Sequence, residues 1–395
     1  MIDLGEIAAT RIAAGLSTGS DAADAGVAAA REAAGGLVDG RVDLAFLFVS
    51  PAHLDQLEDA VAGVLDTLRP RHLLGCVAEG VVAGAREVES GAALAVWAAA
   101  LPAEAHVDLF HAYTVETDEG TAVAGVPAIR DPSLVALLVD PYTFPAGPFL
   151  AKLNEEQPDL PVVGGLAAGG GEPEAQALIL NDRVITEGAV GAVVSGVRVV
   201  TVVSQGCAPI GRDAVITSAE GNVVYELAGQ PALVRLQSEI ASLTPSERAL
   251  AARGVLAGLV IDENQAEYGH GDYLMRALLG ADEDSGALAV GETVRVGQTL
   301  RFHVRDRRTA DEDLHESLAR VLGDGTRPAG ALVFTCNGRG THMFGEPDHD
   351  ARAVAHALGS NALAGFFCGG EIGPVGGRAF LHGYTATLAV FLENA

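Results

Sequence analysis

Two ionisable side chains stand in glycine-rich segments near the end of the chain. Arg339 lies in CNGRG (336–340), directly after the apolar run ALVFTC, and Glu371 lies in GGEIGP (369–374), directly after AGFFC. Glycine lets the backbone approach a ligand closely and present its N–H groups. A guanidinium can hold a carboxylate through two parallel hydrogen bonds. The cation and the anion together match an amino-acid zwitterion, with Arg339 and the loop N–H groups on its carboxylate and Glu371 on its ammonium group.

Each of these side chains also has a structural interpretation. A salt bridge to Glu346 would make Arg339 a structural residue. A turn cap, or a pair with Arg378, would do the same for Glu371. The residue types alone leave both interpretations open.

Cys336 and Cys368, at the ends of the same two apolar runs, suggest a second hypothesis, a cysteine-dependent hydrolase or amidase. Either thiol would be the nucleophile, with His342 or His382 as its base and backbone N–H groups around the oxyanion. Small buried cysteines are, however, common core residues, and no Asp or Asn is spaced to orient a histidine. We therefore predict no catalytic residue. We also predict no metal site, because these cysteines and His349 lack a compact ligand spacing such as CxxC or HxxxH.

The elements that position these residues follow a pattern that occurs four times. An apolar strand is followed after 24–29 residues by Gly-x4-Gly, and a glycine leading a second apolar or alternating run closes each unit. The first strands end at Ser50, Asp140, Asp262 and Cys336, and the motifs begin at Gly75, Gly164, Gly286 and Gly365. Segments with helical periodicity, such as 54–68 and 350–359, lie between strand and motif. The sequence therefore predicts four strand-helix-strand-strand repeats.

Packing limits how such repeats can be arranged. The helix of a unit covers one face of its sheet and leaves the other face apolar. Two sheets pressed together, with helices outside, would bury both faces. We therefore predict an α/β fold, a layered αββα-type sandwich built from the four repeats in two similar halves. The alternative is two separate three-layer domains.

Helix and turn signals divide the chain further. The segment 19–37 predicts a helix with a polar cap before it and glycines after it. Strand signals give way to turn residues over 206–222, which predicts the domain boundary. Pro231 begins the next helix in its first turn. We place the two domains at 1–222 and 223–395.

Several phrases together resemble the FIST family of sensory domains, in which an N-terminal domain precedes a C-terminal domain. They are VVGGLAAGGG (162–171), VVSQGCAPIG (202–211), YLMRALLG (273–280), the run 286–306, CNGRG and GGEIGP. The resemblance covers most of the chain. It implies binding of a small ligand, with amino acids as a favoured class, and it implies no established chemistry and no cofactor. Arg276 and Arg305 lie in such phrases, and a salt bridge is the alternative for each.

The predicted function is therefore a small-molecule-binding sensory protein of FIST type. No histidine-kinase, methyl-accepting or F-box segment is recognised, so we expect a separate, unidentified partner protein to read the binding event. A structural or oligomerisation module, in which the repeats serve assembly, is a third hypothesis. The predicted ligand-binding residues are Cys336, Asn337, Gly338, Arg339, Gly340, Gly369, Gly370, Glu371, Arg276 and Arg305.

Composition excludes several classes of partner. The formal net charge of −27 opposes binding to nucleic acid or anionic lipid. The glycines of 162–171 lack the Lys-Ser/Thr pair of a phosphate loop, and aromatic residues are only 5% of the chain, which disfavours nucleotides. The longest apolar candidate span, 91–101, is too short to cross a bilayer, and the N-terminus lacks a signal-type apolar core. Four widely separated cysteines suit a reducing cytosol, so we expect a cytoplasmic protein.

Overall fold

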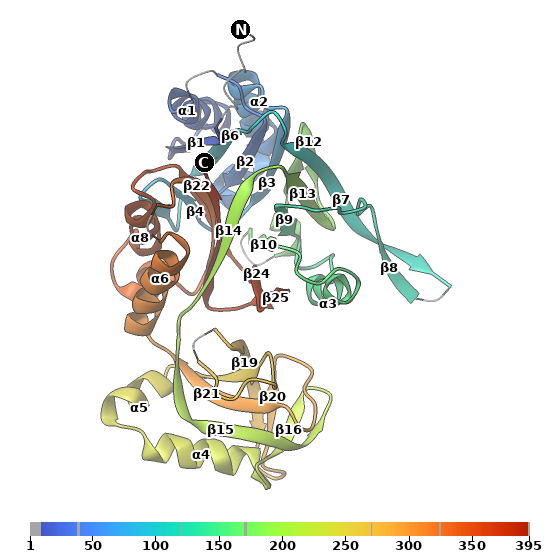
Figure 1. Cartoon of the computed structure of the whole chain (residues 1–395), viewed down its shortest axis with the longest axis vertical. Coiled ribbons are helices and arrows are strands. Elements are labelled where there is room, and N and C mark those ends of the chain that lie inside the picture. Colours follow the sequence, from blue (N-terminus) through green and yellow to red (C-terminus); the bar gives the residue numbers. More distant parts are fainter. Residues whose placement is uncertain are drawn as a thin grey trace. The chain divides into compact units, whose positions relative to one another are not determined.

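The computed structural model describes residues 9–37, 40–118, 120–169, 172–269, 271–323 and 325–393 (Figure 1). The chain forms two compact units built from interleaved segments. Unit 1 consists of Met1–Val203, His315–Leu381 and Thr385–Ala395, and unit 2 consists of Ser204–Leu314 with His382–Tyr384. The division of the sequence at residue 222 stays a prediction. The first eight residues, which entered the signal-peptide prediction, lie outside the described residues.

Unit 1 contains three sheets of mixed strand direction. The first has the order β1 (Arg11–Ser17), β6 (Leu94–Ala100), β2 (Leu44–Val49), β3 (His72–Val77), β11 (Leu178–Leu180), β12 (Arg183–Ile185). The second has the order β25 (Arg378–His382), β24 (Glu371–Val375), β10 (Val162–Leu166), β9 (Leu134–Val139), β13 (Ala189–Ser195), β7 (His106–Thr117), β8 (Gly120–Ala124). The third has the order β14 (Arg198–Gln205), β26 (Thr385–Leu392), β22 (Pro328–Cys336), β23 (Leu363–Cys368), β4 (Val81–Ala83), β5 (Arg86–Val88). In each sheet two central strands are parallel, namely β2 with β3, β9 with β10 and β22 with β23.

Each of these sheets takes its central strands from one predicted repeat and a hairpin from another. The hairpin β11–β12 of the second repeat pairs with β3, β24–β25 of the fourth pairs with β10, and β4–β5 of the first pairs with β23. The exchange is cyclic, and the same backbone hydrogen bond occurs at each step. The three bonds are Val77 N to Ala177 O at 2.8 Å, Leu166 N to Gly370 O at 2.8 Å and Phe367 N to Gly80 O at 3.0 Å. The first, second and fourth repeats therefore complete one another's sheets.

The first glycine of the Gly-x4-Gly motif occupies the same position in these three repeats. An added Cβ at Gly75, Gly164 or Gly365 would lie 2.1, 1.8 or 1.6 Å from a carbonyl oxygen of the neighbouring parallel strand. The carbonyls belong to Leu47, Leu137 and Val333. The motif thus marks a close backbone approach between two parallel strands.

We expect Gly365→Ala to destabilise unit 1 by about 1–3 kcal/mol, because the new methyl group must push β23 away from Val333 O. The measurement is the urea-unfolding midpoint. Gly147→Ala is the matched control, since Gly147 lies in helix α3 (Ala146–Glu156) with nothing within 4 Å of an added Cβ. Equal effects of the two substitutions would show that the close approach does not constrain the motif.

One hydrophobic core fills the space between the three sheets. It includes Phe46 and Trp97 from the first sheet, Leu138 from the second, and Phe334 and Phe391 from the third, all 0% exposed. Phe46 meets Trp97 edge to face at 5.6 Å between ring centroids, and Trp97 lies 5.1 Å from Phe391. The three apolar faces therefore bury one another.

Helices cover the outer faces of these sheets (Figure 1). Helices α1 (Ala22–Gly35) and α2 (Leu57–Leu68) pack on the first sheet, α3 on the second and α8 (His349–Leu358) on the third. The predicted helix at 19–37 is confirmed as α1, whose N-cap Asp21 accepts the N–H of Asp24. The remaining helical segments of unit 1 are η1 (Pro51–Gln56), η2 (Pro173–Ala175) and α7 (Gly340–Phe344), and α6 (Arg307–Val321) continues into it from unit 2. No helix in the described part of the chain is long and apolar enough to cross a membrane.

Unit 2 holds the third repeat, which forms its own sheet. The order is β15 (Cys207–Glu220), β21 (Thr299–Arg305), β18 (Val255–Val260), β19 (Tyr273–Asp282), β20 (Ala287–Val290), β16 (Val223–Leu227), β17 (Gln230–Pro231), with α4 (Ala232–Ser242) and α5 (Pro245–Ala251). Here β18 and β19 are antiparallel, and the described residues between them form no helix. This repeat thus departs from the predicted strand-helix-strand-strand order. The predicted turns at 206–222 are also wrong for most of this range, because β15 continues from Cys207 to Glu220. A register shift between Ile210 and Ala214 accommodates Gly211, whose φ is +66°.

The chain is therefore a mixed α/β protein, as predicted. Its arrangement differs from the expected αββα sandwich in two halves. The first, second and fourth repeats share one core between three sheets, and the third repeat forms the sheet of unit 2. Either arrangement gives each sheet one face on a core and the other under helices, which is why repeat counting did not distinguish them.

Candidate functional site

The two glycine-rich loops predicted to bind a ligand lie side by side in unit 1. They follow the parallel strands β22 and β23, in which Cys336 pairs with Cys368. Asn337 N donates to Cys368 O at 2.9 Å across the two loops. Gly369 N donates to Leu166 O, which fixes the second loop to the end of β10. Carboxyl ends of parallel strands form crevices in α/β proteins, and here two of them carry the predicted residues. We call 336–340 and 369–371 the loop pair.

The Arg339 guanidinium forms its hydrogen bonds with another residue of the protein. The side chain is 0% exposed, with Nε donating to Asp350 Oδ2 at 2.6 Å and Nη2 donating to Oδ1 at 2.9 Å. Its guanidinium carbon lies 5.2 Å from the centroid of the Phe344 ring. The bidentate contact predicted for a ligand carboxylate is made on Asp350, which is the structural salt bridge named as the alternative, with Asp350 as the partner in place of Glu346. A ligand contact of Arg339 stays a prediction. The glycines of the first loop allow this turn, since Gly340 has φ +64°.

Asp350 is ionised because of this contact. Burial works to raise the pKa of the Asp350 carboxyl, but the charge and hydrogen bonds of Arg339 outweigh it and hold the pKa well below its usual value. Thr335 Oγ1 adds a hydrogen bond at 2.7 Å, and His349 Nδ1 lies 3.0 Å from Oδ1. The carboxylate at the start of α8 thus fixes Arg339 over the loop pair.

The Glu371 carboxyl, unlike that of Asp350, is held in its neutral form. The carboxyl group is 0% exposed, and burial raises its pKa to about 8, against hydrogen bonds from Thr385 and Cys336 and the charge of Arg339. Its Oε2 accepts from Thr385 N at 3.1 Å and from Thr385 Oγ1 at 2.8 Å. The predicted alternatives, a turn cap and a pair with Arg378, are replaced by this contact with the first residue of β26. At pH 7 the group is mostly neutral.

Three polar atoms of the loop pair are buried without a hydrogen bond among the described residues. They are Asn337 Oδ1, Arg339 Nη1 and Glu371 Oε1. A buried polar atom without a partner costs about 1–3 kcal/mol. The loop pair therefore offers one charged donor, one amide acceptor, and a carboxyl oxygen, Glu371 Oε1, that donates while Glu371 is neutral and accepts once it is ionised.

The cysteines of the loop pair differ from each other. Cys336 is 9% exposed, and Gly338 N donates to its Sγ at 3.4 Å. Cys368 is 0% exposed, and burial raises the pKa of its thiol well above the ordinary value, with Glu371, Cys76 and Cys336 adding to the rise. Cys368 is therefore a poor nucleophile at neutral pH.

The histidines named for cysteine chemistry or zinc have other surroundings. His342 is exposed, and His382 belongs to unit 2. His349 stacks on Phe344 with ring centroids 3.4 Å apart. Within the described segments, no three His, Cys, Asp or Glu side chains are placed to hold a metal ion.

The two remaining predicted residues belong to unit 2 and are engaged there. Arg276 Nε and Nη2 donate to Glu292 Oε2 at 3.1 and 2.9 Å, which makes the salt bridge named as its alternative. Burial lowers the pKa of Arg276, and Glu292 works against that change. The Arg305 guanidinium lies 5.2 Å from the centroid of the Tyr384 ring. A ligand role for either arginine stays a prediction.

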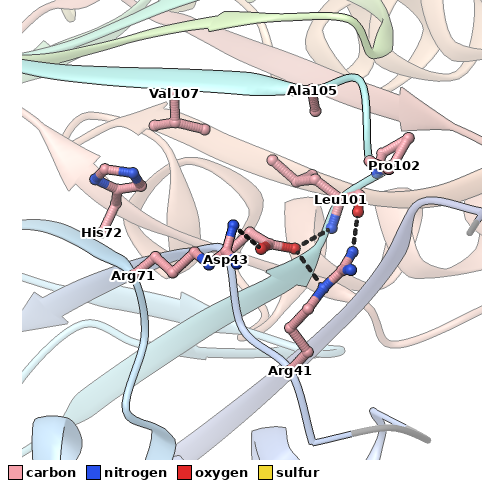
Figure 2. Close-up of a pocket in the computed structure, with 9 residues that line it drawn as sticks. Arg41, Asp43, Arg71, His72, Leu101, Pro102, Ala105 and Val107 are labelled. Atoms are coloured by element: carbon pink, nitrogen blue, oxygen red, sulfur yellow. Dashed lines mark hydrogen bonds and ion pairs between the residues drawn. The ribbon is translucent and has the colours of Figure 1, made fainter.

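A hollow of about 70 Å³, which the sequence did not indicate, lies elsewhere in unit 1 at the amino ends of β2 and β3. Figure 2 shows residues that line it. Asp43 lies at its centre and accepts a hydrogen bond from Leu101 N at 2.8 Å. It also forms ion pairs with Arg41, whose Nε lies 2.9 Å from Oδ2, and with Arg71, whose Nη1 lies 3.5 Å from Oδ1. Arg41 Nη2 also donates to Leu101 O. Desolvation lowers the pKa of the lining His72, with Asp108 opposing the change. This cluster ties three strand ends together, so we assign it a structural role.

Comparison with known proteins identifies the family. The model of the FIST N domain matches residues 43–230, and the model of the FIST C domain matches residues 232–374. The uncharacterized protein Rv0628c of Mycobacterium tuberculosis is 43% identical over 385 residues, which cover 97% of this chain and all of that protein. The uncharacterized protein Mb0898c of Mycobacterium bovis is 43% identical over 390 residues, covering 97% of this chain and 99% of its own. The chain belongs to the FIST family, with an N domain followed by a C domain.

Proposed function

We propose that this protein is a small-molecule-binding sensory protein whose ligand site is the loop pair. FIST domains are generally associated with sensory ligand binding. The observation that carries the proposal is the group of three buried, unpartnered polar atoms on adjacent glycine-rich loops. A ligand that supplies their missing hydrogen bonds gains the free energy that the unliganded protein loses there.

The ligand class that fits best is an α-amino acid. Arg339 Nη1 and the N–H groups of the loop pair would hold its carboxylate, while Glu371 Oε1 and Asn337 Oδ1 would accept from its ammonium group. Arg339 and Glu371 are both fully buried, so entry of a ligand requires the loops to move. Arg339 then binds the ligand through Nη1, while Nε and Nη2 stay bonded to Asp350.

Thermal denaturation with a panel of amino acids and related metabolites tests this proposal. A ligand at about 100 times its dissociation constant adds roughly 2.7 kcal/mol of stability. We expect at least one compound to raise the melting temperature, and Asn337→Ala to remove that rise. Asn361→Ala is the matched control, because Asn361 is exposed and precedes β23. A panel without any stabiliser, or an undiminished rise in Asn337→Ala, would overturn the proposal.

A cysteine-dependent hydrolase acting through Cys336 is the second candidate. The observation that favours it is the Gly338 N–H donated to Cys336 Sγ, next to a carboxyl group that can exchange a proton with the thiol. Rapid alkylation of Cys336 by iodoacetamide at neutral pH would support this candidate. Alkylation no faster than that of the buried Cys207 would end it.

A cytoplasmic location is part of the proposal. All four cysteines lie in described segments, and none of them is in a disulfide. Such thiols are typical of proteins kept in a reducing compartment. We also propose that a separate partner protein reads the ligand-bound state, because the loops that must move for entry would change the surface around them.

A further inference from the structure

Two of the four cysteines, Cys336 and Cys368, lie side by side at the loop pair although they are far apart in the sequence. Cys336 and Cys368 are directly paired positions at the ends of the parallel strands β22 and β23. Cys76 belongs to the same buried core cluster as Cys368, but it lies on β3 of the first sheet. Cys207 belongs to unit 2. The structure therefore selects a close pair of thiols that no spacing in the sequence indicates.

The geometry of the pair suits a covalent bond. Side chains at paired positions of neighbouring strands point to the same face of the sheet. Adjacent strands lie about 4.7–4.9 Å apart, and disulfides span Cα separations of roughly 4.4–6.8 Å. Both residues also end their strands, so the glycines that follow them can absorb the adjustment that a bond requires.

The two thiols differ in exposure, which decides which of them is oxidised first. Cys336 is the more exposed one and receives an N–H from Gly338. Arg339 lies close enough for its charge to interact with Cys336. Cys368 is fully buried and packs against Gly165 on β10. Cys336 therefore meets a small oxidant first, and Cys368 is the resolving thiol.

We infer that Cys336 and Cys368 form a reversible disulfide when the folded protein meets a peroxide. Cys336 gives up its thiol proton and its sulfur attacks one peroxide oxygen. The O–O bond breaks, sulfenic acid forms, and the other oxygen leaves as hydroxide, which takes up the proton released by the thiol and becomes water. The Cys368 sulfur then attacks the Cys336 sulfur, so that the S–S bond forms as the S–O bond breaks. The hydroxide that leaves takes the Cys368 proton and becomes a second water. Two thiols and one hydrogen peroxide thus give one disulfide and two waters.

This modification does not depend on the proposed ligand, and it would lock the two loops together. The bond would join residues that immediately precede Asn337 and Gly369. Because ligand entry requires these loops to move, oxidation would close the proposed site. The disulfide itself can be detected without any ligand, so a failure of the ligand proposal leaves this inference intact.

The test uses the purified full-length protein and hydrogen peroxide. After treatment the protein is denatured, alkylated with iodoacetamide and analysed by mass spectrometry. We expect two of the four thiols to escape alkylation and one cross-linked tryptic species to contain peptides 321–339 and 353–378. Dithiothreitol should restore four alkylated thiols.

Three variants make the result specific. Cys336→Ser and Cys368→Ser should each abolish the cross-link, and Cys207→Ser should leave it unchanged. Thermal melts of all three establish that they are folded. Four alkylated thiols after peroxide treatment, a cross-link from Cys76 to Cys368, or sulfinic acid at Cys336 in place of the disulfide would each overturn the inference. Protein oxidised in urea should give mixed pairings, which shows that the fold selects the pair.

Discussion

Asp350→Ala is expected to lower the free energy of unfolding by about 3–5 kcal/mol, because it leaves the buried Arg339 charge without its partner. Both side chains of this pair are at most 2% exposed, so water cannot replace the lost carboxylate. Thr335 Oγ1 loses its acceptor as well. Urea unfolding followed by circular dichroism gives the free energy. The transition assigned to unit 1 should carry the loss, since both residues belong to it.

Two further variants distinguish the cost of an unpaired buried charge from the cost of losing an exposed ion pair. Glu156→Ala removes an ion pair with Lys152 in which the side chains are 61% and 72% exposed, and it should cost less than about 1 kcal/mol. Replacing Arg339 and Asp350 together by leucine should recover most of the stability lost in Asp350→Ala, because no unpaired charge remains buried. A loss in Asp350→Ala no larger than that in Glu156→Ala would mean that another group satisfies Arg339.

Local elements of the fold could be predicted because their signals are strong and short-range. The apolar runs that end at Ser50, Asp140, Asp262 and Cys336 form β2, β9, β18 and β22. The cyclic exchange of hairpins could not be predicted. Strands β4 and β5 have three residues each, and nothing in those residues indicates that β4 pairs with β23, about 280 positions later. Which edge a short hairpin joins is decided by the whole core.

Some features of the candidate site could likewise be predicted from the sequence, and others could not. The contact between the loop pair could be predicted, because neighbouring parallel strands bring their carboxyl ends together. The partners of its charged residues could not. Asp350 lies in the first turn of α8, eleven positions after Arg339, and a carboxylate there usually indicates only a favourable interaction with the helix dipole. Thr385, which holds Glu371, begins a strand whose position in the third sheet is known only from the fold.

Glu371→Gln is expected to make the protein markedly more stable than the native sequence at pH 9 and similar to it at pH 5. The folded state raises the pKa of Glu371 to about 8, whereas the unfolded chain has an ordinary value of about 4.5. Between these values the folded state binds a proton that the unfolded state has released, so stability falls as pH rises. The contribution of Glu371 to the free energy of unfolding is thus fully present below pH 4.5 and is lost as the pH rises through 8. Each unit of pKa difference corresponds to about 1.4 kcal/mol, so the loss amounts to several kcal/mol.

A second buried carboxyl must be separated from this effect. Burial raises the pKa of Glu87 to about 7, with Asp350 adding to the rise and the Ala351 N–H opposing it. Glu87→Gln should therefore remove the part of the pH dependence that ends near pH 7, and Glu371→Gln the part that ends near pH 8. Thermal or urea unfolding from pH 5 to pH 9 measures both, with the exposed Glu156→Gln as control.

If the free energy of unfolding of Glu371→Gln fell with rising pH as steeply as that of the native sequence, the raised pKa assigned to Glu371 would be contradicted. The same carboxyl links stability to ligand binding. If an ammonium group binds at Glu371, it must displace the proton, so calorimetry at pH 7 in buffers of different ionisation enthalpy should detect about one proton released per ligand. Glu371→Gln should abolish that release. A ligand that binds tightly without releasing a proton would occupy another part of the loop pair, with Glu371 remaining neutral beside it.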